Sequence, residues 1–147
     1  VYCALSREDV ATIMASEQVA VGSDGQGMNA EEDGAATTHP RSYGTFARVL
    51  GQFVRQQGVL SLPVAVYKMT GLPAARLGLR DRSLLKPGYA ADLVLFDPAK
   101  IQDRADFHNP HQYPAGMVQV WVNGVAVVED GRLTGKATGR VLRKNPS

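Results

Sequence analysis

The sequence has a single cysteine, Cys3, among its 147 residues, so no disulfide can form within the chain. A secreted scaffold held together by disulfides is therefore excluded, and a reducing compartment is favoured. Long hydrophobic runs are also missing, since none approaches the ~18 residues that a membrane-spanning helix requires. We expect a cytoplasmic protein with no membrane partner.

The chain also lacks a strong excess of charge of one sign. Its 16 Lys and Arg residues and 14 Asp and Glu residues leave a net charge of +2. The basic residues are scattered and are not interleaved with aromatic side chains, so we expect no nucleic-acid partner. The length and the 44% hydrophobic share are sufficient for one globular core. The chain starts at Val1 without an initiating methionine, which indicates a fragment of a longer protein.

Helical patterns fill most of residues 1–78. Ser6 followed by Glu8 and Asp9 is typical of a capping box and predicts a helix over residues 7–16. Further along, an amphipathic stripe predicts a helix from Thr45 to the glycine at position 58. The stripe consists of Phe46, Val49, Leu50, Phe53 and Val54. Two shorter helices are expected over residues 62–70 and 73–77, each followed by a glycine.

Strand patterns appear at two places. The apolar run Val19-Ala20-Val21 is typical of a short buried strand, and the polar residues 26–40 that follow predict an irregular loop. From residue 79 onward the strand pattern dominates. Residues 91–96 predict one strand, and alternating valines before Asn123-Gly124 predict a hairpin with residues 125–129. A second turn at Asp130-Gly131 adds residues 132–134 to the meander.

The most informative polar residue is Asp24. It follows the predicted strand and is flanked by Gly22, Ser23 and Gly25. Open α/β sheets and β/α barrels place catalytic groups at such strand ends. An aspartate that only caps a turn or the next helix fits the same four residues.

Two other positions could carry chemistry. Arg41 has a planar guanidinium that can hold a carboxylate through two hydrogen bonds, and the nearby His39 could bind a metal or transfer a proton. A solvated pair of loop residues is the alternative for both. His108 and His111 are separated by a proline and lack helical geometry, so we do not interpret them as a metal-binding pair.

Five segments taken together resemble the C-terminal part of the N-acyl-D-amino-acid deacylases, or D-aminoacylases, of the amidohydrolase superfamily. The resemblance extends from Val1 to about Arg143. The segments are Val21-Gly22-Ser23-Asp24-Gly25, His39-Pro40-Arg41-Ser42-Tyr43-Gly44-Thr45-Phe46, Lys68-Met69-Thr70-Gly71-Leu72-Pro73-Ala74, Pro87-Gly88-Tyr89-Ala90-Ala91-Asp92-Leu93-Val94-Leu95-Phe96-Asp97 and Val122-Asn123-Gly124.

The resemblance implies an α/β fold in which a zinc-binding β/α (TIM-type) barrel carries a small β-sandwich. Residues 1–78 would supply the last barrel strand, the Asp24 loop and the closing helices. Residues 79–147 would supply the C-terminal strands of the sandwich. The remaining barrel, including a His-x-His pair, a cysteine and two later histidines as metal ligands, would lie upstream of Val1. The fragment alone would therefore bind no zinc and be inactive.

The resemblance also implies a reaction and two roles. The complete enzyme would hydrolyse linear amides, converting N-acyl-D-amino acids to a carboxylate and a free D-amino acid. Asp24 would be a metal ligand and the catalytic acid and base, taking a proton from the attacking water and passing it to the leaving amine. Arg41 would bind the substrate carboxylate.

Other readings remain open at this point. The parent could be another amidohydrolase, similar to a hydantoinase or a dihydroorotase, because the sandwich motifs do not determine the substrate. The chain could also be a non-catalytic β/α binding module or a partner subunit. If upstream barrel strands are absent, we expect the isolated fragment to self-associate through the exposed flank of residues 19–21 and the edge of the sandwich.

Overall fold

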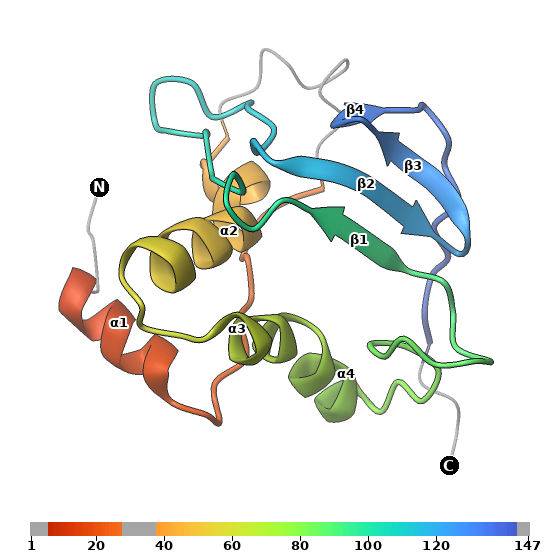
Figure 1. The fold of residues 1–147 in the computed structure, drawn as a ribbon, viewed down its shortest axis with the longest axis horizontal. Coiled ribbons are helices and arrows are strands. Elements are labelled where there is room, and N and C mark those ends of the chain that lie inside the picture. Colours follow the sequence, from red (N-terminus) through yellow and green to blue (C-terminus); the bar gives the residue numbers. More distant parts are fainter. Residues whose placement is uncertain (1–5, 28–37, 144–147) are drawn as a thin grey trace.

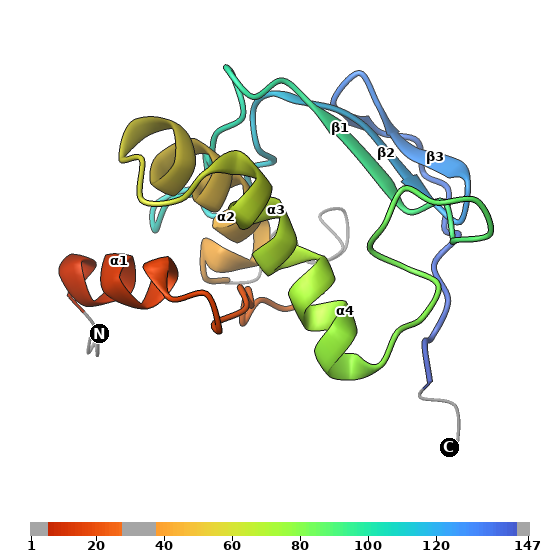
Figure 2. The ribbon, with the colours of Figure 1, turned by 60° about the horizontal axis from the view of Figure 1, so that its bottom comes forward.

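The computed structural model describes residues 6–27 and 38–143, and a helical part precedes a four-stranded antiparallel sheet along the chain (Figure 1). The helices are α1 (Arg7–Ala15), α2 (Arg41–Arg48), η1 (Val49–Gln56), α3 (Leu62–Met69) and α4 (Gly71–Leu77). The strands are β1 (Leu93–Phe96), β2 (Met117–Val122), β3 (Val125–Glu129) and β4 (Arg132–Leu133). In Figure 2, α2, α3 and α4 lie together on one side of the sheet.

The capping box at the start of α1 is confirmed. The Asp9 N–H donates to the Ser6 hydroxyl, and the Ser6 N–H donates to the Asp9 carboxylate at 3.1 Å. These bonds satisfy backbone donors that the first helical turn leaves without partners. The other end of α1 has no basic residue in its last turn. Its partly buried Val10 and Met14 pack against the core of the other helices.

The amphipathic stripe forms a helix as predicted, but the helix begins earlier and widens. It starts at Arg41, directly after Pro40, and from Val49 onward it has π-type turns, as in the bond from the Gln57 N–H to the Gln52 carbonyl. Gly51 lies where this helix approaches the carbonyl of Ile101, which an added Cβ would meet at 2.8 Å. Only glycine permits that close approach.

The two shorter helices also form, but the second begins earlier than predicted, at Gly71. α3 has its N-cap at Ser61, and α4 ends at Gly78, whose φ of 71° is left-handed. Glycine adopts this backbone conformation without steric cost, which is why it terminates helices so often.

The sheet is a meander with the order β1-β2-β3-β4, and every neighbouring pair is antiparallel. Asn123 and Gly124 both have positive φ, 51° and 81°, as the predicted tight hairpin turn requires. Asp92 helps to hold β1 in place, because its carboxylate accepts from the Asn123 N–H at 2.8 Å and pairs with Arg82.

One cluster of buried side chains joins the helices to the chain beyond β1. It comprises Ala47, Val49, Leu50, Phe53, Leu60, Ala65 and Ile101. Ile101 is 1% exposed, and Phe96 and Met117 of the sheet pack against the same cluster. Arg55 strengthens the junction by donating to the Ile101 carbonyl at 2.6 Å. The helical part and the first residues after the sheet's edge strand therefore share a core.

The prediction of a strand over residues 19–21 is wrong for this structure. The Val21 N–H donates to the Lys68 carbonyl at 3.0 Å, but no ladder forms. An apolar run becomes a strand only where a neighbouring strand accepts its backbone hydrogen bonds, and none lies beside it in the described part of the chain. Most of the predicted loop over residues 26–40, and Cys3, lie outside the described residues.

Candidate active site

Asp24 and Arg41 form an ion pair, with 3.0 Å between the Asp24 Oδ2 and the Arg41 Nη1. The side chain of Asp24 is 83% exposed and that of Arg41 is 44% exposed. The structure thus brings together the two residues that the sequence analysis selected separately. It places the guanidinium on Asp24 itself, a contact that the sequence did not predict.

The backbone at Asp24 is unusual for a residue with a side chain. Its φ is 49°, in the left-handed region, and Gly25 follows it. A Cβ on Gly25 would lie 2.9 Å from the Cα of Ser42, so the loop passes directly against the first turn of α2. Left-handed conformations at non-glycine residues cost energy and cluster at functional sites. The close packing at Gly25 holds this one in place.

Ser42 links the two loops that lead to Asp24 and Arg41. Its hydroxyl accepts from the Gln26 N–H at 3.2 Å and lies 3.2 Å from the hydroxyl of Thr38. His39 lies two positions before Arg41, and its Nδ1 accepts from the Arg41 N–H at 3.1 Å. This bond ties the His39 ring to the backbone at Arg41.

The ring of His39 contacts Phe107 edge to face, with 5.0 Å between the ring centroids. His111 lies in the same connection between β1 and β2 as Phe107, and its Nδ1 is 3.2 Å from the hydroxyl of Tyr43 on α2. His108 is linked instead to Asp106, whose carboxylate accepts from the His108 N–H at 2.8 Å. His39, His108 and His111 thus have separate neighbours.

The described residues offer few metal ligands close to one another. Among residues 6–27 and 38–143, no three His, Cys, Asp or Glu side chains gather closely enough to hold a metal ion. The exposed carboxylate of Asp24 suits one position around zinc, because carboxylate oxygen is an accepted zinc ligand. The described residues therefore fit the role of one ligand, and the others would have to come from elsewhere in the protein.

Lys68 is a buried charged residue that the sequence analysis did not select. Its exposed fraction is 0%, and its Nζ donates to the Ser16 carbonyl. Burial lowers the pKa of the Lys68 ammonium, and the negative charge of Glu17 acts in the opposite direction. The signal was present in the spacing, since Ala65 and Lys68 lie at positions i and i+3 of α3 and share its buried face.

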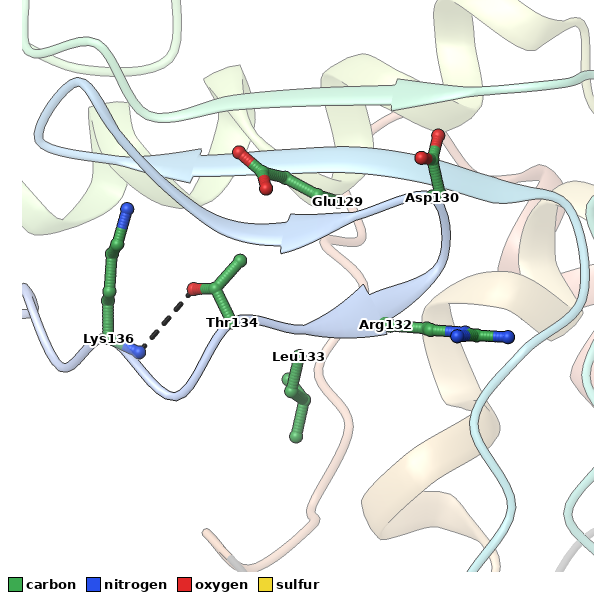
Figure 3. Close-up of a pocket in the computed structure, with 6 residues that line it drawn as sticks. All are labelled: Glu129, Asp130, Arg132, Leu133, Thr134 and Lys136. Carbon is green, nitrogen blue, oxygen red and sulfur yellow. Dashed lines mark hydrogen bonds between the residues drawn. The ribbon is translucent and has the colours of Figure 1, made fainter.

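A concave surface lies on the hairpin of β3 and β4 (Figure 3). It is lined by Glu129, Asp130, Arg132, Leu133, Thr134 and Lys136. Two acidic and two basic side chains share this surface, so it offers no field of one sign to a charged ligand. Neither Asp24 nor Arg41 lines it.

No helix in the described part of the chain is long and apolar enough to cross a membrane.

Comparison with known proteins shows which family the chain resembles. The model of the amidohydrolase family matches residues 10–128. A D-aminoacylase of Alcaligenes xylosoxydans xylosoxydans is 44% identical over 144 residues, which cover 98% of this chain and 28% of that protein. The chain therefore spans less than a third of that curated relative.

Two solved deacylase structures are also similar to this chain. A D-aminoacylase crystal structure superposes with a TM-score of 0.86 at 46% identity, covering 95% of this chain and 28% of that one. The N-acyl-D-glutamate deacylase of Bordetella bronchiseptica, solved with zinc and a phosphonate that mimics the tetrahedral intermediate, gives a TM-score of 0.76 at 39% identity. That alignment covers 88% of this chain and 27% of the other.

Proposed function

Because this chain belongs to the amidohydrolase family, we propose that it supplies the C-terminal part of a zinc-dependent hydrolase that converts N-acyl-D-amino acids to a carboxylate and a free D-amino acid. The observation that carries the proposal is the ion pair of Asp24 and Arg41, an acid and a carboxylate-binding cation held together in a chain similar to deacylases over nearly its whole length. The substrate is a small molecule, and the remaining barrel is the structural partner.

The proposal includes an architecture. Residues 1–78 supply the last strand and closing helices of a β/α (TIM-type) barrel, and residues 79–147 supply C-terminal strands of a β-sandwich. The change from helices to an antiparallel meander along the chain supports this division. Segment 19–21 fits it too: no strand of the described residues pairs with it, and it would find its neighbouring strands in the rest of the barrel.

In the proposed reaction, Asp24 moves the proton. Its carboxylate accepts a proton from the attacking water and returns it to the nitrogen of the leaving D-amino acid. The left-handed backbone at Asp24 and the packing of Gly25 on Ser42 fix where this carboxylate lies. The high exposure of the side chain supports access by substrate.

Arg41 binds the substrate carboxylate and orients Asp24. One guanidinium nitrogen, Nη1, engages the Asp24 Oδ2, and the fork has five N–H donors in all. Arg41 can therefore hold Asp24 and a substrate carboxylate at the same time. A substrate held in this way has its amide beside Asp24, the carboxylate that transfers the proton from water to the amide nitrogen.

Zinc fits this chain through one residue. Asp24 would supply one oxygen ligand, and histidines and a cysteine outside this chain would supply the others. When bound, zinc polarises the amide carbonyl and makes water a nucleophile near neutral pH.

The test uses the complete protein that contains this chain and compares Asp24→Asn with Asp130→Asn. Asp130 is a matched control, because it has the same residue type and the same φ of 49°, but lies in the β3–β4 turn. We expect Asp24→Asn to lower kcat on N-acyl-D-amino acids by about 100-fold to 10,000-fold and Asp130→Asn to leave it unchanged.

The substrate panel separates the remaining readings. Hydrolysis of a hydantoin or a dihydropyrimidine, without hydrolysis of N-acyl-D-amino acids, would replace the deacylase by a different amidohydrolase. Absence of any amidase activity in the zinc-loaded complete protein would leave a binding module. Near-normal turnover of Asp24→Asn with zinc still bound would refute the catalytic role of Asp24.

A further inference from the structure

Lys68 is completely buried in α3, with an exposed fraction of 0%. Lysine is almost never fully buried unless its ammonium group has partners, since removing it from water is costly. Ala65 on the same helical face is also 0% exposed and belongs to the hydrophobic cluster. A methionine or leucine would pack there without a desolvation cost, so the amine calls for a specific explanation.

The two polar ends of Lys68 contact both ends of one short segment. The side-chain Nζ donates to the carbonyl of Ser16, the residue that caps the C-terminus of α1. The backbone carbonyl of Lys68 accepts from the N–H of Val21 at 3.0 Å. Residues 16–21 are the connection between α1 and the loop of Asp24, and Asp24 lies three positions after Val21.

α1 provides a second reason for a cation at this place. The last turn of a helix exposes carbonyls without partners and carries a partial negative charge. α1 has no basic residue of its own in its last turn. Lys68 supplies, from another helix, the positive donor that this helix end lacks.

We propose that Lys68 is a positioning residue for Asp24: it fixes residues 16–21 at both ends and thereby sets where the carboxylate lies. The inference rests on the proposed function, since it concerns the residue assigned to proton transfer. Because Lys68 itself is buried and its Nζ bonds to Ser16, it acts through the backbone and not by contact with substrate.

The experiment uses the zinc-loaded complete protein with Lys68→Met and Lys68→Arg. Methionine keeps an unbranched chain of similar length and removes the donor, whereas arginine keeps a cationic donor of different length. Ile101→Ala is the control for instability alone, because Ile101 lies in the same core but contacts neither Ser16 nor Val21 through a hydrogen bond. kcat, KM, zinc content and Tm are measured for each variant.

We expect Lys68→Met to lower kcat by about 10-fold to 100-fold, the loss that a displacement of about 1 Å causes, with KM within about twofold and zinc retained. Lys68→Arg should fall between wild type and methionine. Ile101→Ala should lower Tm and leave the kcat of the folded enzyme unchanged. If the methionine variant does not fold, a lower kcat of Lys68→Arg at unchanged KM supports the proposal.

Three results would overturn it. The first is a wild-type kcat in Lys68→Met or, if that variant does not fold, in Lys68→Arg. The second is an equal loss of kcat in Lys68→Met and Ile101→Ala at equal Tm. The third is a change in KM with kcat unaltered. A wild-type protein without deacylase activity would instead refute the proposed function, which keeps the two failures distinct.

Discussion

The carboxylate of Asp103 lies directly against Gly44 on α2, so closely that a Cβ added at Gly44 would overlap it. The carboxylate cannot move aside without losing its bonds. It accepts from the Arg48 Nε at 2.7 Å and from the Ala105 N–H at 2.9 Å, and its side chain is 8% exposed. Gly44 therefore belongs to the junction between α2 and the segment after β1.

Gly44→Ala is expected to destabilise the protein. Overpacking costs about 1–3 kcal/mol, and breaking the bonds of Asp103 adds to this, which exceeds the ~1 kcal/mol that alanine gains over glycine in a helix. Thermal unfolding should give a lower Tm. In an Asp103→Ala background the clash is gone, so the same substitution should raise Tm, and a loss of equal size in both backgrounds would contradict the explanation.

Gly25→Ala is expected to lower activity more than stability. The new Cβ would lie 2.9 Å from the Cα of Ser42, so the loop must move, and Asp24 moves with it. Gly27→Ala is the matched control, because a Cβ there meets nothing within 4 Å. In the complete enzyme we expect kcat to fall about 10-fold or more for Gly25→Ala. Equal kcat for the two variants would show that Gly25 does not position Asp24.

Arg41→Lys is expected to raise KM, because lysine cannot replace a planar fork that binds a carboxylate and Asp24 together. The check is a pair of substrates, an N-acyl-D-amino acid and the corresponding N-acyl amine without a carboxylate. The variant should lose about 10-fold or more in kcat/KM on the first substrate and much less on the second, since a charged hydrogen bond contributes about 1.5–3 kcal/mol. Equal losses of kcat/KM on both substrates would show that Arg41 does not bind the substrate carboxylate.

The capping box predicts a dependence of stability on acid. Hydrogen bonds from Ser6 lower the pKa of Asp9 from its ordinary value of 3.8. A depressed carboxyl pKa stabilises the folded state above pH 3.8 and loses this effect as pH falls through the lower, folded value. Asp9→Asn should therefore make the Tm of the isolated chain depend less on pH between about pH 5 and about pH 2. Ser6→Ala should do the same, and an unchanged slope in both would contradict the role of the box.

The isolated chain is expected to self-associate. β1 pairs only with β2 within the described residues, and Val94 and Leu95 on it are 57% and 48% exposed. An unpaired edge with exposed apolar side chains is a template for another strand. Val94→Lys should shift sedimentation toward the monomer, since a charged edge resists pairing. A wild-type chain that stays monomeric at high concentration would show that the β1 edge does not mediate self-association.

Local patterns predicted the elements that depend on neighbours in sequence. The capping box, the apolar stripe of η1 and the Asn123-Gly124 turn each contain their own cause, and each forms. The run at residues 19–21 failed because a strand needs a partner that its own residues do not specify. Long-range pairs were likewise beyond local patterns.

The candidate site illustrates the same division. Sequence analysis selected Asp24 and Arg41, but not their contact, because the two residues lie far apart in the sequence. Lys68 was missed because a charged residue in a helix normally points to solvent. Its place on the same face as Ala65 was the only local sign of burial.

The position of Ile101 in the helical core has a consequence for synthesis on the ribosome. A nascent chain emerges from its N-terminus, so α2, η1 and α3 leave the ribosome before the residue that completes their hydrophobic cluster. In the meander, β2, β3 and β4 pair across short turns, whereas residues 97–116 separate β1 from β2. α2, η1 and α3 therefore cannot complete their hydrophobic cluster until synthesis has passed Ile101.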